Sequence, residues 1–299
     1  MKIGFSLFWS TLLHQPHPNH PANWERAFPD MDQSLDRLKE FGLTSIELKL
    51  TERVDISALF RAIEKVLKRD FHVTIHAAGR IRFPADVPWQ IQNISDISRQ
   101  LHEKFFITPL WVIHPLYGIE IPRNEVFDQT LDYLKTLTAH LADDAVTLAL
   151  EILRNRPDNE KIHVGDSYHE ILDLLTGLDS RKWGICWDFG HAFSMYERNL
   201  QSKFPPQEFL DRVVHCHVHD SKDQITHLPL GQGHLPIQQN IHLLMARGYD
   251  GIFNLEIEPH KVRDPENFMN YLNSSISLLK KIFDRAGETV QPASPSNHR

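Results

Sequence analysis

Ionisable side chains end six of the apolar, strand-like runs in this sequence, and they are the residues best placed to do chemistry. Three are histidines and three are carboxylates: His76, His114, His217, Glu151, Asp188 and Glu256. A buried strand seldom carries an ionisable group unless that group is paired or binds a metal ion. Six such endings in one chain therefore predict a shared site for metal-binding or acid–base chemistry.

The elements that must position these residues follow from an alternation of short apolar runs with segments of helical period. Eight runs are predicted to be strands: Ile3–Phe8, Ser45–Leu50, His72–His76, Leu110–His114, Thr147–Ile152, Gly184–Asp188, Val213–His217 and Ile252–Ile257. Between them, apolar residues recur at helical spacing, as at Leu59, Ile63 and Val66. Eight such repeats predict a single (β/α)₈ TIM barrel. A doubly wound sheet is the alternative, but no glycine-rich nucleotide motif follows the first run, and we expect no nucleotide cofactor.

In a (β/α)₈ barrel the carboxyl ends of all strands meet at one face. We therefore expect the six strand-end groups to converge there, joined by His191, three residues after Asp188, and by His227, in the loop after the seventh strand. Two glutamates, one aspartate and one histidine suit a divalent ion such as Mn²⁺, Mg²⁺, Co²⁺ or Zn²⁺. Taken singly, each of these groups could equally be a helix cap, a solvated residue or the partner of an arginine.

The strand parity leaves some assignments open. Glu258 lies two residues after Glu256 and would point the same way, so it is a rival ligand. His215 and His219 share the parity of His217; at least one of them is expected to line the barrel interior or to accept a backbone hydrogen bond, and we treat both as non-ligands.

Three loop features carry weaker signals. The segment Ser10–Pro29 contains three histidines and is either a lid over the barrel mouth or a surface excursion without a role. Arg80 and Arg82 lie where they could clamp an anionic substrate, although a solvated role fits them equally. The Gly231-x-Gly233 sequence indicates a tight loop and could cradle a phosphate through its N–H groups.

Composition limits the classes of partner. The chain has 299 residues, a net charge of −7 and a pI near 6.2, which argues against nucleic acid or an anionic membrane as a partner. No run reaches the roughly 18 apolar residues needed to span a bilayer. Two cysteines in strand-like runs favour a reducing compartment, and we expect a cytoplasmic protein. One barrel domain is expected over residues 1–285, and a polar, Pro/Ser-rich disordered tail over 286–299.

The order of motifs resembles that of the xylose isomerase-like TIM-barrel superfamily, which includes sugar-phosphate isomerases and epimerases, ketose 3-epimerases and endonuclease IV. The resemblance rests on these stretches: IHAAG (75–79), VIHPLYG (112–118), LALEIL (148–153), ICWDFGHAF (185–193), HVHDS (217–221), HLPLGQG (227–233) and GYDGIFNLEI (248–257). It covers nearly the whole chain, and its pieces are short but specific in combination.

The resemblance implies roles for the strand-end residues. The metal ligands shared by the isomerases and epimerases would be Glu151, Asp188, His217 and Glu256, and the register after Tyr-Asp-Gly places Glu256 rather than Glu258 at the metal-binding position. His191 would contact substrate, and we assign His76, His114 and Arg80 to substrate binding with it.

The resemblance to endonuclease IV also implies a larger cluster. Positions that look like His76, His114, His191 and His227 complete a three-metal cluster in that enzyme. This chain departs from the pattern at Ile225, where endonuclease IV has an aspartate, and Asp223 could replace it only with a changed loop. The departure puts the third metal in doubt.

Three functional hypotheses follow. The leading one is a divalent-metal-dependent isomerase or epimerase that acts on a sugar or sugar phosphate through an enediolate, with Glu151 and Glu256 moving the proton. The main rival is a multi-metal zinc phosphodiesterase of the endonuclease IV type. A third is a non-catalytic sugar-binding barrel. Dehydratase and lyase chemistry also occurs in the superfamily.

Overall fold

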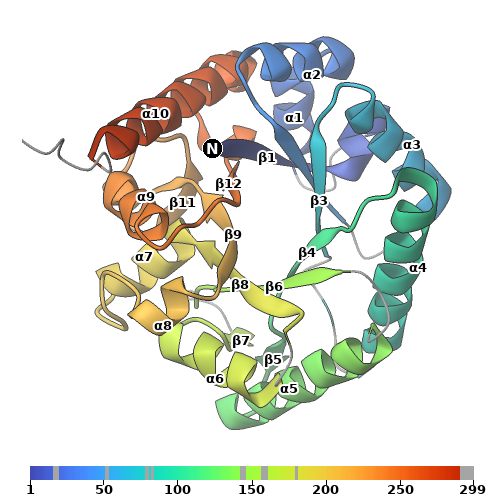
Figure 1. The fold of residues 1–299 in the computed structure, drawn as a ribbon, viewed down its shortest axis with the longest axis vertical. Helices are drawn as coiled ribbons and strands as arrows, with labels where there is room; N and C mark the ends of the chain where they lie inside the picture. The colour runs from blue at the N-terminus through green and yellow to red at the C-terminus, as the bar shows by residue number, and fades with distance from the viewer. Residues whose placement is uncertain are drawn as a thin grey trace, which may run out of the picture.

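The computed structural model of this chain describes residues 1–15, 20–50, 54–77, 81, 84–141, 146–155, 161–178 and 181–289. Eight parallel strands close into a barrel in the order β1-β2-β3-β4-β6-β8-β9-β12 (Figure 1). Their bounds are β1 Lys2–Phe8, β2 Ser45–Lys49, β3 His72–His76, β4 Leu110–Ile113, β6 Thr147–Glu151, β8 Trp183–Asp188, β9 Val213–Val218 and β12 Ile252–Leu255. The predicted single (β/α)₈ barrel is confirmed, and each expected strand ends within two residues of its predicted bounds.

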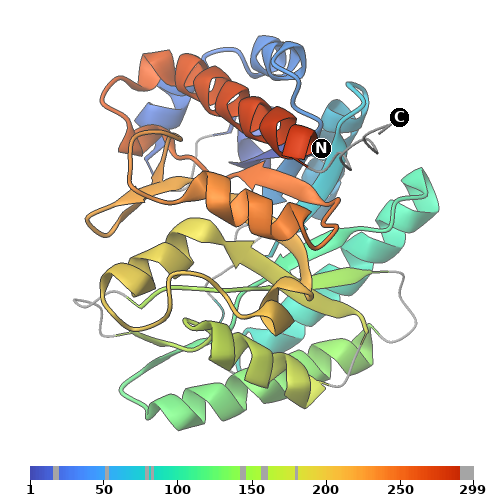
Figure 2. The ribbon, with the colours of Figure 1, turned by 60° about the vertical axis from the view of Figure 1, so that its left-hand side comes forward.

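Helices surround the barrel on its outside (Figures 1 and 2). The α-helices are α1 Pro21–Ala27, α2 Met31–Glu40, α3 Ile56–Leu67, α4 Val87–Phe105, α5 Arg123–His140, α6 Tyr168–Leu178, α7 Phe189–Glu197, α8 Gln207–Leu210, α9 Ile237–Met245 and α10 Phe268–Thr289. Short 3₁₀ turns are η1 Trp9–Leu13, η2 Pro259–Lys261 and η3 Pro265–Asn267. Two small antiparallel sheets lie outside the barrel. One pairs β5 (Tyr117–Ile119) with β7 (Lys161–His163), and the other is the hairpin of β10 (Asp220–Lys222) and β11 (Ile225–Leu228).

Helix α3 illustrates how the local sequence produces these elements. Asp55 caps its start, because the carboxylate accepts a hydrogen bond from the N–H of Ala58 at 3.0 Å. Leu59, Ile63 and Val66 recur at helical spacing and are fully buried against the barrel. Burying each such side chain contributes about 1.5–3 kcal/mol, so one apolar face is enough to dock the helix.

The last helix closes the ring of helices. Helix α10 lies beside α9 (Figures 1 and 2). Its first residue, Phe268, packs on Phe5 of β1 with ring centroids 6.2 Å apart. Lys280 donates to the carbonyl of Phe41, at the end of α2, at 2.7 Å. The tail expected over 286–299 begins inside this helix: residues 286–289 are helical, and residues 290–299 lie outside the described residues.

The loop between β11 and α9 is held by a buried aspartate. The carboxylate of Asp220 accepts hydrogen bonds from the N–H groups of Gly231, Gly233 and Leu235 at 2.9, 2.8 and 3.2 Å. A side chain at Gly233 would meet Asp220 at 2.3 Å, so only glycine allows this approach. The idea that these N–H groups cradle a phosphate is therefore wrong, since Asp220 already occupies them.

The histidine-rich segment after β1 forms η1 and α1 in its described part, and residues 16–19 lie outside the described residues. The ring of His20 stacks on that of His260 after β12, with centroids 4.0 Å apart. None of the helices in the described ranges combines the length and apolar character that a bilayer crossing requires.

Candidate metal centre

Four of the predicted site residues come from neighbouring strands and meet at one side of the barrel. Glu151 ends β6, Asp188 ends β8, His217 lies in β9 and Glu256 directly follows β12. These strands are adjacent in the barrel, and Asp188 stands beside His217 in the β8–β9 register. One ligand atom from each of the four residues lies within 4.8 Å of all the others. The carboxyl ends of four consecutive strands thus gather the expected ligand set.

Burial makes this cluster costly without a cation. Asp188 and His217 are fully buried, and Glu151 and Glu256 are at most 4% exposed. The Nδ1 atom of His217 and the Oε2 atom of Glu256 lie 3.2 Å apart, yet neither makes a hydrogen bond with any described residue. Buried polar atoms are normally paired, and a ring nitrogen and a carboxylate oxygen that face each other at this distance share either a proton or a metal ion. The residues present therefore fit a divalent ion.

A buried glutamate on β2, Glu47, holds His217 from behind. Its carboxylate lies 3.1 Å from the Nε2 atom of His217 and 2.9 Å from that of His215, and Ser6 donates to it at 2.7 Å. Because Nε2 of His217 donates to this carboxylate, Nδ1 is the nitrogen that faces the cluster, and its lone pair is available to a metal ion once Nδ1 has lost its proton. Glu47 was not among the predicted site residues, although a glutamate inside the apolar run Ser45–Leu50 was an available signal.

A half-buried lysine on the same strand, Lys49, forms an ion pair with the buried Glu256. Lys49 ends β2, and it is neighboured in the barrel by His76, the last residue of β3. The surroundings of Glu256 and Glu258 also show which of these two candidate ligands belongs to the cluster. Glu256 lies in the cluster, whereas Glu258 is one quarter exposed and approaches His260 at 3.2 Å.

Two further histidines approach the cluster from β3 and β4. The Nε2 atoms of His76 and His114 lie 3.1 and 2.8 Å from the Oε2 atom of Glu151, and 3.2 Å from each other. This convergence could hold substrate oxygens or a second ion. Both residues lie where the sequence predicted, at the carboxyl ends of their strands.

Electrostatics keep the two glutamates ionised. Burial alone would raise the pKa of Glu151, but His114 and His217 outweigh it and hold that pKa well below its ordinary value. For Glu256, burial is likewise outweighed by Lys49 and His217, and its pKa is also well below the ordinary value. Both carboxylates are therefore available as metal ligands or proton acceptors near neutral pH.

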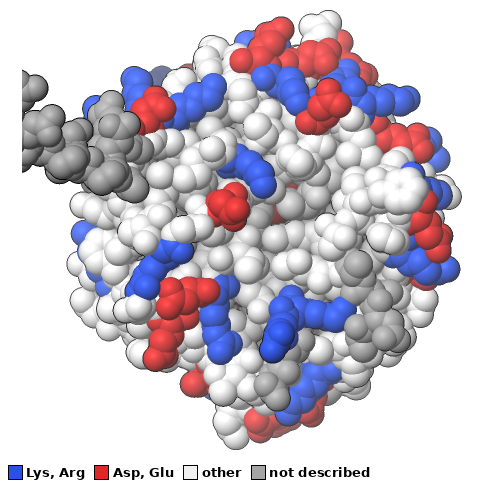
Figure 3. All heavy atoms as spheres, in the orientation of Figure 1, with Lys and Arg blue, Asp and Glu red and all other residues white. Residues whose placement is uncertain are grey.

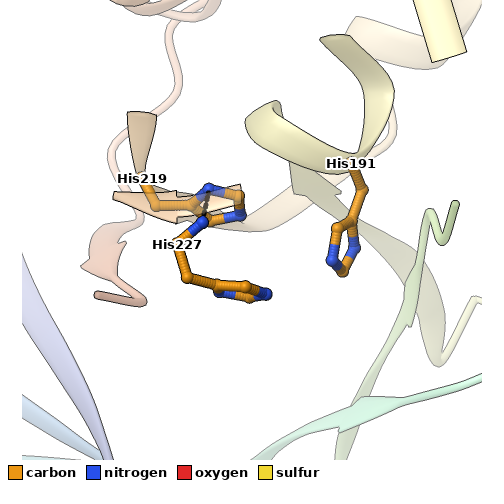
Figure 4. Close-up of side chains that lie close together, drawn as sticks. All are labelled: His191, His219 and His227. Carbon is orange, nitrogen blue, oxygen red and sulfur yellow. Dashed lines mark hydrogen bonds between the residues drawn. The ribbon is translucent and has the colours of Figure 1, made fainter. Parts of the chain in front are cut away.

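Three histidines form a second group beside the cluster (Figure 4). The rings of His219 and His227 stack with centroids 4.3 Å apart, and His191 faces them edge-on at 5.8 and 5.5 Å. The backbone N–H of His191 donates to the carboxylate of Asp188 at 2.6 Å, so Asp188 also caps helix α7. His191 and His227 lie beside the cluster as expected, while His219 was not expected to take part.

The remaining predicted residues lie elsewhere. Arg80 and Arg82 fall outside the described residues. Ile225 is 52% exposed on β11, and Asp223 is exposed in the turn before it. Neither residue adds a carboxylate to the buried cluster.

The fold and this centre define a (β/α)₈ barrel with a buried carboxylate–histidine site at the carboxyl ends of its strands. Residues 35–282 match the family of xylose isomerase-like TIM barrels. The chain belongs to this family.

Individual relatives are more distant. The uncharacterized protein MJ1311 of Methanocaldococcus jannaschii is 25% identical over 189 residues, which cover 57% of this chain and 60% of that protein. The chain thus spans less than two thirds of the length of this curated relative.

Solved structures of sugar epimerases share the fold over nearly the whole chain. A D-tagatose 3-epimerase-like protein is 20% identical with a TM-score of 0.68, covering 97% of this chain and 100% of that one. An L-ribulose 3-epimerase is 14% identical with a TM-score of 0.68, covering 99% and 100%. At these identities the likeness establishes the fold.

Proposed function

We propose that this protein is a divalent-metal-dependent isomerase or epimerase that acts on a sugar or sugar phosphate. The observation that carries the proposal is the convergence of two buried, ionised glutamates with Asp188 and His217 within 4.8 Å. The fold shared with sugar epimerases supports the substrate class. The two buried, free cysteines support a cytoplasmic location.

The four residues Glu151, Asp188, His217 and Glu256 would hold the ion. When bound, the ion would stabilise negative charge on adjacent carbonyl and hydroxyl oxygens of the substrate. Glu151 and Glu256 come from β6 and β12, which are separated in the barrel by β8 and β9. They therefore approach a substrate in the mouth from two sides. One carboxylate removes the proton beside the carbonyl and the other returns a proton, which interconverts the sugars through an enediolate.

Other residues orient the substrate. His191 would hold a substrate oxygen, and His76 and His114 would contact the sugar from β3 and β4. Arg80 is proposed to bind an anionic end of the substrate. Lys49 keeps Glu256 ionised through their ion pair.

The test is solvent deuterium exchange into a panel of ketoses and their phosphates, with added Mn²⁺. We expect wild type to incorporate deuterium at the carbon beside the carbonyl. Glu151→Gln and Glu256→Gln should each lose about 10²–10⁴-fold, the range of general acid–base catalysis. Glu258→Gln is the matched control and should exchange like wild type. Unchanged exchange in either of the first two variants would contradict the acid–base assignment.

The convergence of His76, His114 and Glu151 favours a second candidate, a multi-metal zinc phosphodiesterase of the endonuclease IV type. Ile225 speaks against it because it supplies no ligand. On the face in Figure 3, acidic and basic side chains are interspersed around the rim, so the described residues form no broad basic stripe there for a phosphate backbone. Cleavage of abasic DNA by the zinc-loaded protein would favour this candidate. Sugar binding without turnover would instead indicate a non-catalytic barrel.

A further inference from the structure

The three-histidine group beside the cluster has two interpretations. Three imidazoles are a common zinc ligand set, and one nitrogen from each of His191, His219 and His227 lies within 4.8 Å of the others. Alternatively, the group is a hydrogen-bond relay that serves the four-residue centre. The two interpretations differ in which nitrogen of His219 carries hydrogen.

The backbone of His227 determines which ring nitrogen of His219 carries the hydrogen. Its N–H points at the Nδ1 atom of His219 at 2.9 Å, the dashed line in Figure 4. A backbone N–H always carries its hydrogen, so Nδ1 must accept and cannot itself be protonated. The carbonyl of Asp220, 3.2 Å from Nδ1, is therefore not a hydrogen-bond acceptor for this ring. The hydrogen of the neutral imidazole consequently lies on Nε2.

The Nε2 atom of His219 points at a proposed metal ligand. It lies 3.0 and 3.1 Å from the two carboxylate oxygens of Asp188, so its N–H donates to that side chain. Both nitrogens of His219 are then used in hydrogen bonds, and neither has a lone pair left for an ion. This donor and the backbone N–H of His191 together fix the orientation of the Asp188 carboxylate.

A glycine opposite the ring shows that the backbone is shaped around it. A side chain at Gly190, the second residue of α7, would place its Cβ 1.9 Å from the Cε1 atom of His219. Helix α7 therefore begins against the face of this imidazole, which is fully buried. The glycine of the Asp-Phe-Gly-His sequence is explained by this contact.

We propose that His219 is a positioning residue, fixed with its hydrogen on Nε2, that orients Asp188 for the metal ion, and that the three-histidine group is not a further metal site. The inference rests on the proposed function, since it takes Asp188 to be a metal ligand. It assigns to this chain a link from the β10–β11 hairpin, through the His227 backbone, to the metal centre.

Substituting His219 by Asn or by Gln tests its two hydrogen bonds one at a time, because each amide can keep only one of them. The Oδ1 atom of Asn stands near the imidazole Nδ1 and can still accept from His227, but Asn cannot reach Asp188. The Nε2 atom of Gln stands near the imidazole Nε2 and can still donate to Asp188. We therefore expect His219→Asn to bind Mn²⁺ about 10–100-fold more weakly than wild type, and His219→Gln to retain most of the affinity. His234→Asn and His234→Gln, at an exposed position, are the matched controls.

The binding stoichiometry provides the opposing outcome. If the group holds an ion, wild type will bind a second equivalent of Zn²⁺ that both His219 variants lose, and the proposal is overturned. Equal Mn²⁺ affinity in the Asn and Gln variants would also overturn it. Thermal melting of each variant checks that it is folded.

The tautomer can also be read directly in wild type, which keeps the proposal testable if a variant does not fold. Long-range ¹H–¹⁵N correlation spectra of the protein, with His219 assigned from its backbone, should show the hydrogen on Nε2 with and without Zn²⁺. A hydrogen on Nδ1, or a Zn²⁺-bound Nε2, would refute the assignment. Neither measurement needs a substrate, so a failure of the sugar assay would leave this result separate.

Discussion

Replacing Glu47 by Gln tests whether this buried carboxylate holds His217 in place for the metal ion. The carboxylate of Glu47 accepts from the Nε2 atoms of His217 and His215 at 3.1 and 2.9 Å, in a fully buried position. Hydrogen bonds to charged groups contribute about 1.5–3 kcal/mol and neutral ones about 0.5–1.5 kcal/mol. The amide should therefore weaken each bond by about 1 kcal/mol, which lowers the free energy of unfolding by about 2 kcal/mol. The Ser6 hydroxyl can turn to accept from the new amide.

The same substitution should also weaken metal binding, beyond its effect on the free energy of unfolding. With a weaker acceptor at Glu47, the lone pair on Nδ1 of His217 is less firmly held toward the ion, and Mn²⁺ should bind about 10–100-fold more weakly. The assay pairs urea unfolding without metal with calorimetric Mn²⁺ titration. Glu170→Gln is the control, because Glu170 pairs with Arg123 on the outer layer of helices at 2.7 Å and should affect stability alone. Wild-type Mn²⁺ affinity in Glu47→Gln would refute the reasoning.

Three further predictions concern protons, thiols and a helix cap. Burial lowers the pKa of His217, but the surrounding acidic groups outweigh it and raise that pKa well above 6.5, so the metal-free protein holds a proton there at pH 7. Metal binding should release this proton, so Mn²⁺ affinity should rise between pH 6 and 8. Calorimetry in buffers of different ionisation enthalpy measures the release, and a result of no proton released would contradict this prediction. Burial raises the pKa of Cys216 to about 12 and that of Cys186 well above its ordinary value, so neither thiol should react with a disulfide reagent at pH 8 until urea unfolds the chain. Asp30→Ala should lower the free energy of unfolding by about 1 kcal/mol in urea titrations, because the Asp30 carboxylate accepts from the N–H of Gln33 at the start of α2; a change of less than about 0.3 kcal/mol would argue against the cap.

The fold followed from the sequence because strand and helix periods alternate eight times, and that alternation dictates a parallel barrel. The same logic placed Glu151, Asp188 and His217 together, since parallel strands end on one face. These predictions needed only the position of each residue along its own strand.

The groups that hold the ligands in place could not be predicted in this way. Glu47 meets His217 across 170 positions of sequence, and strand parity shows only that both face the interior. The hydrogen bond that fixes His219 comes from the backbone of His227, in a hairpin whose path no periodicity describes. Long-range partners and loop backbones depend on the whole packed structure, which local patterns do not encode.

The most direct test of the metal centre is a titration of the metal-free protein with Mn²⁺, wild type beside Glu151→Ala. We expect one tightly bound ion per wild-type chain and loss of that ion in Glu151→Ala, with both proteins folded. No divalent ion bound by wild type, or equal binding by the two proteins, would contradict the four-residue metal centre.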